Sequence, residues 1–447
     1  MNMYSHLIYP IIDLARRTDA LKTFKYLNKA QWQSPEEIQE LQRQSLAKLL
    51  CQCYQNVPFY RNVFDECDFK PWENITVADL QKLPVIDKET VQNNREQFKS
   101  EDWEATQPRW GSTGGTTSRA LQFYISRATH SSTIASVMLQ WQDAGYKLGD
   151  KMIYLGGASL YPGLGNLKTW LYHKLQRLVT LSSFDITEEH LRKYVKQIRK
   201  SKAHFLRGYA SSIYVLAKYL IDNNITDLHI EAVFTTAETL FPHYRKTIQQ
   251  AFGCEVYNEY GARDGGILAF ECSQHTGLHI NALTCLVEIV DDDNNLLPTG
   301  ETGNVLLTSL DNYAFPFIRY KVGDRASISS EYCPCGRGLP MLEHVEGRSG
   351  DFVITPSGMK IHSEFFSHIF WEFPAVKQFQ IRQKQLNNIE ILIASNNGNL
   401  KDEDINKIKS IVSRRCEHSQ VKIHQVAEIP QTASGKWRYV VSELDNT

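Results

Sequence analysis

The sequence predicts an α/β protein with a large N-terminal domain and a small C-terminal α+β domain. Between residues 150 and 260, short apolar runs alternate with helical patterns, which is typical of mainly parallel or mixed sheets covered by helices. From 278 to 330 the apolar period changes to two, which indicates an antiparallel β subdomain. A separate pattern begins after Gly347. We therefore expect an N-terminal domain at 1–347 and a C-terminal domain at 348–447.

Helices are expected to open the chain. Ser34 fits an N-cap, Pro35 fits the first helical position, and Glu37 completes a capping box. Apolar residues at helical spacing then run from Ile38 to about Tyr54. This helix is expected to pack on the core and to take no part in chemistry.

The alternating region supplies the elements of the predicted parallel sheet. Strands are expected at 152–155, 203–206 and 232–235, and helices at 187–200, 211–221 and 244–252. Another strand is expected to begin at Val256. Parallel sheets bind ligands at the carboxyl ends of their strands, so the loops there are the first place to seek a site.

Turn signals separate the later strands. Residues 291–295 and 298–300 contain turn-forming residues between apolar runs, which predicts antiparallel pairing of the flanking strands. The elements expected from here to the end of the chain are strands at 286–290, 304–308, 378–383, 389–394 and 421–427 and a helix at 402–415.

Composition excludes several classes of protein. The chain has 447 residues, and its 49 Lys and Arg against 50 Asp and Glu give 49 − 50 = −1. No basic excess exists to displace counterions from phosphates, so a dedicated nucleic-acid binder is not expected. The sequence contains no run of ~18 apolar residues, so no membrane-spanning helix is expected. The apolar stretch 7–15 lacks the features of a signal peptide. Nine cysteines, an odd number, fit a reducing cytoplasm.

The most informative stretch is a loop rich in glycine and hydroxyl residues. Between Gly111 and Ser118, three glycines stand among serines and threonines. Such a loop can fold tightly around an anion and direct N–H groups and hydroxyls at phosphate oxygens. It is not a Walker A loop, because no Gly-Lys-Ser/Thr follows. Taken alone, a flexible surface loop explains it equally well.

Four further motifs follow in order. Tyr257–Asp264 comes directly after a predicted strand, and Arg319–Asp324 ends the antiparallel region. Gly347–Asp351 spans the predicted domain boundary, and Thr432–Lys436 lies near the C-terminus. With the loop, this series resembles the adenylate-forming superfamily of acyl-CoA synthetases, and within it the phenylacetate–CoA ligase family. The nearest resemblance is to proteins of capsular-polysaccharide clusters related to coenzyme F390 synthetase.

The resemblance implies an ATP site built from these motifs. Tyr260 would lie against adenine with its flat ring. Asp324, expected on a turn after a strand, would accept hydrogen bonds from the ribose hydroxyls. The implied catalytic residues are Lys436, which would approach the α-phosphate and carboxylate oxygens, Arg348, which would reach ribose or phosphate, and Asp264, which would hold Mg²⁺. The other implied ATP-binding residues are Ser112, Thr113, Gly114, Gly115, Thr116, Thr117, Glu238, Gly261 and Arg263.

Several positions depart from the family pattern. Ser118 has a Cβ where glycine is usual, so a positive φ there would be strained. Arg263 and Asp264 replace a threonine and a glutamate: Asp264 keeps the charge on a shorter arm, and Arg263 either binds phosphate or blocks it. Gly350 occupies the hinge position, where an acidic residue or lysine is commoner. These changes are expected to affect rate and the second half-reaction more than the fold.

A second group of residues has the composition of a metal site. Cys333 and Cys335 form a tight pair in a turn, and Cys272 precedes both His275 and His279. Zn²⁺ prefers four nitrogen or sulfur ligands in a tetrahedron, so we predict a structural zinc site formed by Cys272, His279, Cys333 and Cys335, as in some relatives. His279 is preferred because Gly-Leu-His-Ile matches the family pattern. The alternative is a set of unrelated buried thiols.

The resemblance implies a cytoplasmic enzyme that uses ATP, Mg²⁺ and CoA. It would convert a carboxylate to an acyl-adenylate, release pyrophosphate and pass the acyl group to CoA, with the C-terminal domain moving as a lid between steps. One alternative is transfer to an amine or hydroxyl of a surface-polysaccharide precursor. Another is a nucleotide-binding protein with weakened catalysis. The expected partners are a small-molecule carboxylate and its acceptor, with a homodimer left open.

Overall fold

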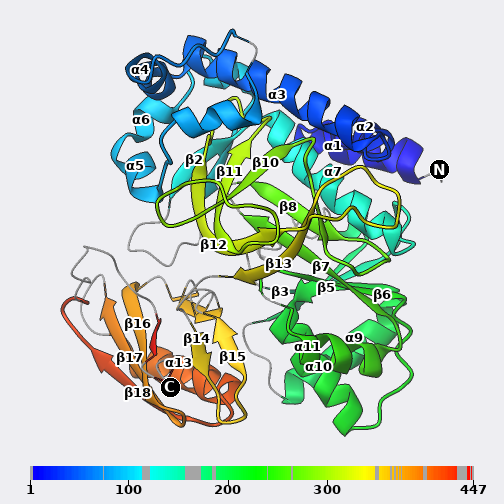
Figure 1. Cartoon of the computed structure of the whole chain (residues 1–447). Helices are drawn as coiled ribbons and strands as arrows, with labels where there is room; N and C mark the ends of the chain where they lie inside the picture. The colour runs from blue at the N-terminus through cyan, green and yellow to red at the C-terminus, as the bar shows by residue number, and fades with distance from the viewer. Residues whose placement is uncertain are drawn as a thin grey trace.

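The computed structural model arranges the chain as an N-terminal group of helices, a large central sheet and a C-terminal sheet (Figure 1). The residues that it describes are 4–73, 75–112, 121–156, 173–183, 188–238, 240–262, 265–347, 352–362, 365–366, 369–370, 372–373, 375–395, 400–429, 440–442 and 444.

The N-terminal helices cover the antiparallel strands. The expected helix is α3 (Pro35–Asn56), and its capping box is present: Glu37 N–H donates to Ser34 Oγ at 3.2 Å, and Ser34 N–H donates to Glu37 Oε2 at 2.9 Å. Its inner face, with Leu46 and Leu49, is buried in the main apolar cluster. The neighbouring elements are η1 (Tyr4–Ile8), α1 (Tyr9–Arg16), α2 (Ala20–Ala30), α4 (Pro58–Glu66), η2 (Val77–Lys82), α5 (Lys88–Asn93), α6 (Arg95–Phe98) and η3 (Trp103–Thr106).

The centre of the molecule is an eleven-stranded sheet in the order β10-β11-β12-β13-β9-β8-β7-β6-β5-β3-β4. Five strands pair in parallel: β3 (Met152–Gly156), β4 (Leu178–Ser182), β5 (Phe205–Tyr209), β6 (Ala232–Thr236) and β7 (Glu255–Ala262). The alternating pattern predicted all of them except β4.

The antiparallel strands continue this same sheet, because β8 pairs with β7. The expected period of two is confirmed in the pairing of β10 with β11. These strands are β8 (Gly266–Glu271), β9 (Leu278–Ile280), β10 (Cys285–Val290), β11 (Gly303–Ser309), β12 (Tyr320–Ile328) and β13 (Met341–Gly347).

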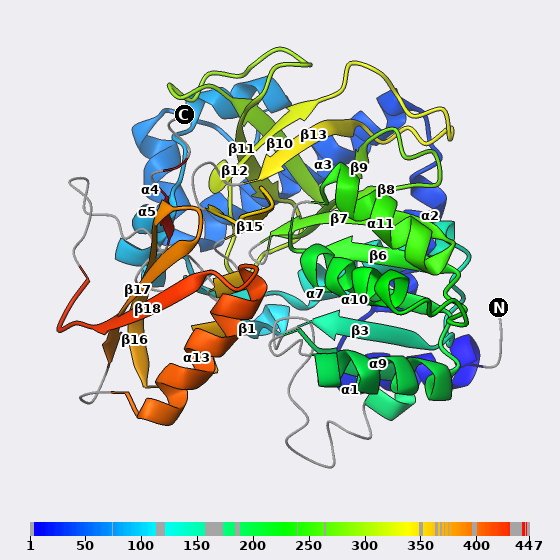
Figure 2. The same cartoon turned by 90° about the horizontal axis from the view of Figure 1, so that it is seen from below.

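Helices cover both faces of the parallel strands. On one face lie α9 (Glu188–Ser201), α10 (Ala210–Asp222) and α11 (Pro242–Phe252), which pack on Leu206 and its neighbours. On the other lies α7 (Arg127–Asp143), whose Trp141 packs with β-strand aromatic side chains. Figure 2 shows these two layers on opposite sides of the strands. Successive strand residues point to opposite faces, so both layers require apolar partners.

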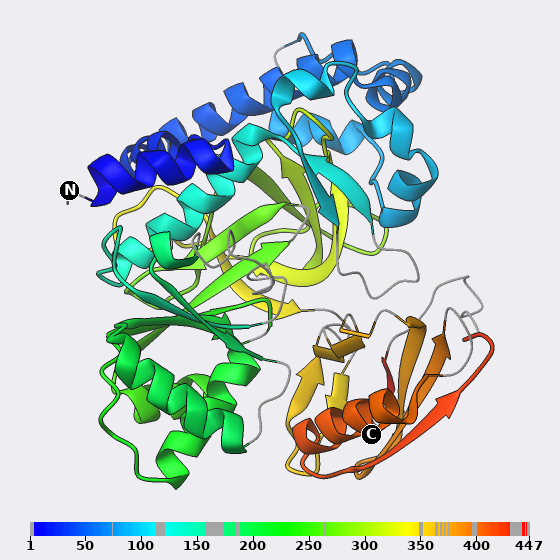
Figure 3. The same cartoon turned by 180° about the vertical axis from the view of Figure 1, so that it is seen from behind.

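The C-terminal part forms its own small sheet, in the order β18-β17-β16-β19 (Figure 3). One helix packs on it, as the sequence predicted, and a two-stranded hairpin that the sequence did not predict precedes it. Its elements are β14 (Phe352–Ile354), β15 (Lys360–His362), β16 (Val376–Gln385), β17 (Asn388–Ser395), α13 (Asp402–Arg415), β18 (Gln420–Gln425) and β19 (Val440–Ser442).

The buried apolar residues fall into two groups along the chain. The buried residues of the C-terminal cluster fall between Val353 and Val440, whereas those of the other clusters end at Leu342. Residues 348–351 lie outside the described residues, so the boundary after Gly347 stays a prediction.

Of the helices described here, none combines the length and apolar character that crossing a bilayer requires.

Candidate active site and metal centre

Two of the implied ATP-binding residues meet across the sheet. The Tyr260 hydroxyl on β7 donates a hydrogen bond of 2.9 Å to Asp324 Oδ2 on β12. Three strands lie between β7 and β12 in sheet order, a separation of about 19 Å if the sheet were flat. The sheet therefore curves strongly here, and its curvature brings together residues 64 positions apart.

The expectation that Asp324 lies on a turn after a strand is wrong, because Asp324 lies inside β12. Between the pairs Leu306–Lys321 and Asn304–Arg325, β11 advances two residues and β12 advances four. The extra residues form a bulge around Gly323, whose φ is 89°. Glycine adopts this left-handed conformation without a steric cost, so the strand bends and continues.

The first two residues of the glycine-rich stretch, Gly111 and Ser112, lie in β1 (Arg109–Ser112), which pairs with β2 (Gln122–Ile125) so that Ser112 lies opposite Gln122. Gly261 is also placed: a Cβ there would lie 2.9 Å from the Gly266 carbonyl oxygen, so a larger residue would push β7 and β8 apart. The other loop and catalytic candidates lie outside the described residues: Thr113, Gly114, Gly115, Thr116, Thr117, Arg263, Asp264, Arg348 and Lys436.

Glu238 lies just beyond the carboxyl end of β6, where ligands bind in parallel sheets. The residue before it, Ala237, has a φ of 63°. This left-handed conformation is uncommon for a residue with a Cβ and is concentrated at functional sites. The sequence pattern gave no sign of this strain, which adds a structural reason to keep Glu238 among the candidates.

A buried ion pair supports the strand that carries Tyr260. Arg207 on β5 donates from Nε to Glu259 Oε2 at 3.0 Å, and its Nη2 makes a shorter contact with Oε1. The Arg207 guanidinium also lies over the Tyr154 ring, 5.5 Å from its centroid. Glu259 immediately precedes Tyr260, so this pair helps to fix the direction of β7 beside the candidate nucleotide site.

The four predicted metal ligands come together. The ligand atoms of Cys272, His279, Cys333 and Cys335 all lie within 4.8 Å of one another. Cys272 Sγ lies 3.6 Å from Cys333 Sγ, and Cys335 Sγ lies 3.4 Å from His279 Nε2. Zn–S bonds of about 2.3 Å in a tetrahedron place two sulfurs about 3.8 Å apart, so the side chains fit a zinc ion.

The three sulfurs have mixed surroundings, because burial raises the pKa of Cys272 to about 12 while hydrogen-bond donors lie near each sulfur. Each sulfur has a potential hydrogen-bond donor nearby, and such contacts orient and tune metal ligands. Burial lowers the pKa of His279 to about 4, so its imidazole is neutral at neutral pH, the form that binds metals. The donors are Gln274 N–H, 3.4 Å from Cys272 Sγ, Thr276 Oγ1, 3.5 Å from Cys333 Sγ, and Arg337 Nη1, 3.4 Å from Cys335 Sγ.

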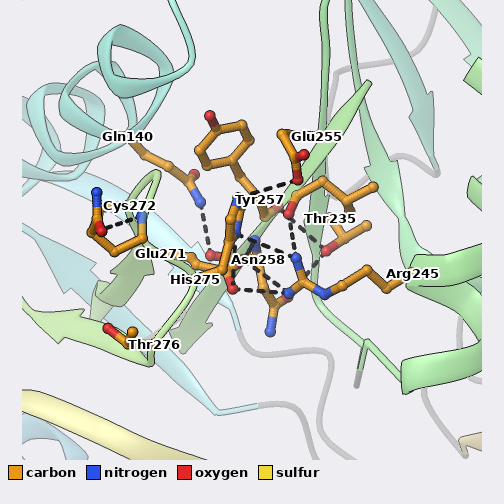
Figure 4. Close-up of polar contacts among 12 residues, drawn as sticks. Gln140, Thr235, Arg245, Glu255, Tyr257, Asn258, Glu271, Cys272, His275 and Thr276 are labelled. Atoms are coloured by element: carbon orange, nitrogen blue, oxygen red, sulfur yellow. Dashed lines mark hydrogen bonds and ion pairs between the residues drawn. The ribbon is translucent and has the colours of Figure 1, made fainter. Parts of the chain in front are cut away.

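The carboxylate of Glu271, next to Cys272, is the centre of a polar network (Figure 4). Arg245 Nη2 on α11 lies 2.9 Å from both carboxylate oxygens. The Asn258 N–H on β7 donates to Oε2 at 2.7 Å, and His275 Nδ1 lies 3.2 Å from Oε1. Glu271 is 4% exposed, so these partners replace the water that its charge would otherwise require.

Further contacts extend this network to two neighbouring elements. Thr235 Oγ1 on β6 donates to Asn258 Oδ1 at 3.1 Å, and Gln140 Nε2 on α7 donates to the Asn258 carbonyl at 2.8 Å. His275 Nε2 lies 3.4 Å from Glu255 Oε2. His275 therefore faces the carboxylates and not the metal group, which agrees with the preference for His279.

Sequence reasoning did not identify Glu271 and Arg245 as members of this network, and it did not predict the pairing of Arg207 with Glu259. A usable signal was present, because Glu259 and Glu271 are charged residues within apolar strand patterns. A charge in a buried strand requires a partner. The identity of that partner is set by tertiary packing, which no local pattern encodes.

Replacing Arg245 by methionine should destabilise the fold strongly. The Glu271 carboxylate would stay buried without its arginine, a loss that typically costs about 3–5 kcal/mol. Urea unfolding measures this change in free energy. The matched control is Arg199→Met, whose pair with Asp227 is exposed on both sides and should contribute about 1 kcal/mol or less. Equal losses in the two variants would contradict a structural role for the network.

The chain has relatives along almost its full length. Residues 353–443 match the family model described as the CapK C-terminal domain. The chain is 26% identical over 421 residues to Protein CapK of Staphylococcus aureus, covering 91% of this chain and 90% of that protein. It is 25% identical over 380 residues to phenylacetate–coenzyme A ligase of Thermus thermophilus, covering 80% and 81%. It is 27% identical over 265 residues to indoleacetate–lysine synthetase of Pseudomonas savastanoi, covering 58% and 63%.

Solved structures share the architecture. The crystal structure of 2-hydroxyisobutyryl-CoA ligase in the postadenylation state matches with a TM-score of 0.63, over 94% of this chain and 92% of that one, at 17% identity. At 17% sequence identity this match establishes the fold and nothing more. It confirms the expected fold class. The chain is thus a homologue of CapK and of the phenylacetate–coenzyme A ligases, and it has the fold of the adenylate-forming CoA ligases.

Proposed function

We propose that this protein is an ATP-dependent acid–thiol ligase that forms an acyl-adenylate and transfers the acyl group to CoA. The observation that carries the proposal is the contact between Tyr260 and Asp324. It brings the side chain proposed for adenine to the side chain proposed for ribose. Homology to phenylacetate–coenzyme A ligases over most of the chain supports the same reaction class.

The proposed reaction has two half-reactions. In the first, a carboxylate oxygen attacks the α-phosphorus of ATP and pyrophosphate leaves. Residues 113–117 would bind the phosphates, Asp264 would hold the Mg²⁺ that shields them, and Lys436 would stabilise the charge developing at the α-phosphate. In the second, the CoA thiolate attacks the acyl carbonyl carbon and AMP leaves.

We also propose that residues 348–447 act as a lid over this site. Arg348 and Lys436 belong to that segment, so its position decides whether they reach the nucleotide. Its separate apolar core would allow it to move as one body. In support, 2-hydroxyisobutyryl-CoA ligase has been solved in both postadenylation and thioesterification states.

A second candidate differs only in the acceptor. The homology to indoleacetate–lysine synthetase favours an amine as the nucleophile of the second half-reaction. An amine or hydroxyl of a surface-polysaccharide precursor would then replace the CoA thiol. The cytoplasmic location expected from the sequence stays a prediction, and whether the protein forms a homodimer stays open.

We further propose that one zinc ion binds Cys272, His279, Cys333 and Cys335. Four protein ligands leave no open coordination position, so the ion would be structural. Cys272 follows β8, His279 lies on β9, and the cysteine pair lies between β12 and β13. The ion would therefore join the strands next to Tyr260 and Asp324 and keep them in register.

Pyrophosphate–ATP exchange with aryl acids, amino acids and sugar acids tests the proposed activity. An acid that supports exchange should yield a CoA thioester, whereas an amide or ester would favour the second candidate. Lys436→Ala should slow exchange by about 10²–10³-fold, the usual loss for one preorganised charge contact, and should affect transfer from a supplied acyl-adenylate much less. The exposed Lys422→Ala should behave as wild type.

Other outcomes would overturn these assignments. Equal loss in both half-reactions of Lys436→Ala would contradict the lid. ATP binding without exchange for any acid in the screen would favour a nucleotide-binding protein with weakened catalysis.

Asp324→Ala should weaken ATP binding by about 10–100-fold, because hydrogen bonds to a charged group contribute about 1.5–3 kcal/mol. Titration calorimetry measures the affinity, and circular dichroism checks the fold. Asp293→Ala is the control, since Asp293 is exposed in the turn after β10. Unchanged ATP affinity in folded Asp324→Ala protein would remove this carboxylate from the nucleotide site.

Elemental analysis of untagged wild-type protein should give about one zinc ion per chain. The Cys333→Ser variant should contain less zinc. Thermal stability should fall with it, because metal binding contributes to folding. Cys67→Ser, at an exposed cysteine, should keep the zinc. If the wild-type protein contains no zinc and all of its cysteines titrate as free thiols, the alternative of unrelated buried thiols is favoured.

A further inference from the structure

Large apolar side chains are exposed in the first helices and in the turn after α2. Leu7, Ile11 and Leu14 are 61%, 61% and 80% exposed, and Tyr26 and Trp32 are 53% and 50% exposed. These are five of the ten large hydrophobic residues exposed in the described part of the chain. The spacing of Leu7, Ile11 and Leu14, four and then three residues, places them along one helical face.

This face is not needed for the protein's own core. The opposite side of the segment already packs inward: Tyr4, Tyr9 and Ile12 form a buried cluster with Ala20 and Met138. A surface helix of a globular protein normally presents polar residues on its outer side. Here α1 is apolar on both sides, and clustered exposed apolar residues mark interaction surfaces.

Hydrogen bonds hold α1 firmly against α2. The buried carboxylate of Asp13 accepts a hydrogen bond from Thr18 Oγ1 at 2.6 Å. It also accepts from the N–H groups of Ala20 at 3.3 Å and Leu21 at 3.0 Å. Since these are the first residues of α2, Asp13 fixes the angle between the two helices, and the exposed face of α1 is presented in a defined orientation.

The exposed face of α2 is basic. Lys22, Lys25 and Lys29 are exposed at a spacing of three and four residues, and Arg17 is exposed between the helices. No ion pair joins any of these four to an acid within the described residues. The one acid between them, Asp19, is paired with Arg127 at 2.7 Å, so this surface carries excess positive charge.

We propose that α1 and α2 form a docking surface for an anionic lipid bilayer. Apolar side chains beside lysines are the combination that binds the boundary between headgroups and acyl chains. A second copy of this chain would bring the same positive charge and would be repelled. In Figures 1 and 3 the segment lies on the side of the molecule away from the C-terminal sheet, so docking would leave that sheet clear.

Vesicle sedimentation of the full chain tests this proposal. Wild-type protein should bind vesicles of phosphatidylcholine mixed with phosphatidylglycerol, more weakly at high salt, and should bind pure phosphatidylcholine poorly. The variant with Leu7→Ser, Ile11→Ser and Leu14→Ser should lose about tenfold or more of this binding. The variant with Lys22→Gln, Lys25→Gln and Lys29→Gln should lose its preference for anionic vesicles.

Matched controls separate this surface from general stickiness. Leu386→Ser removes an exposed leucine elsewhere, and Lys196→Gln with Lys200→Gln removes exposed lysines of α9; both should bind as wild type. Circular dichroism checks that each variant is folded. Wild-type protein that does not bind mixed vesicles would overturn the proposal, as would equal binding by the three-serine variant. A dimer that dissociates in that variant, without vesicle binding, would instead identify a self-association face.

Discussion

The buried carboxylate of Glu271 is the constraint on which both candidate sites depend. Arg245 reaches it from α11, the Asn258 N–H from β7, and His275 from the turn after β8. Glu271 is adjacent to Cys272, and Asn258 lies two residues before Tyr260. One charge therefore fixes both the turn that contains the candidate metal ligand Cys272 and the strand that presents the candidate adenine contact. A displacement at the candidate metal site would therefore reach that strand through the hydrogen bonds of Glu271.

Helices and strands that are specified by residues close together in the sequence could be predicted. The helix beginning at Pro35 has its capping box within four residues, and the alternation from 150 to 260 carries the parallel sheet. Asp324 shows where local signals fail. Gly323 can serve either a turn or a bulge, because both use a positive φ. The choice is made by the pairing of β12 with β11, which lies outside the motif.

The candidate site also contains residues that could be predicted from the sequence and residues that could not. Tyr260 and Asp324 could be named because their motifs, in order, resemble those of a known family, and the four candidate metal ligands because their residue types suit zinc. The structure brings the members of each group together. The supporting network could not be named, because Arg245 and Glu271 are 26 residues apart and many arginines could satisfy a buried glutamate. A charged residue in an apolar strand indicates that a partner is needed, but the tertiary packing determines which residue that partner is.

The buried charges serve geometry more than stability. Among the described residues, four arginine–carboxylate pairs are largely buried: Arg207–Glu259, Arg245–Glu271, Arg319–Glu288 and Arg337–Asp143. Burial raises the pKa of Glu288 and of Asp143 although each faces an arginine, so desolvation outweighs pairing in both. Apolar side chains of similar volume often fit such positions at no cost in stability. Three of the pairs contain a residue within two positions of Tyr260, Cys272 or Cys335. We infer that the directional contacts of these pairs hold the candidate functional side chains in place.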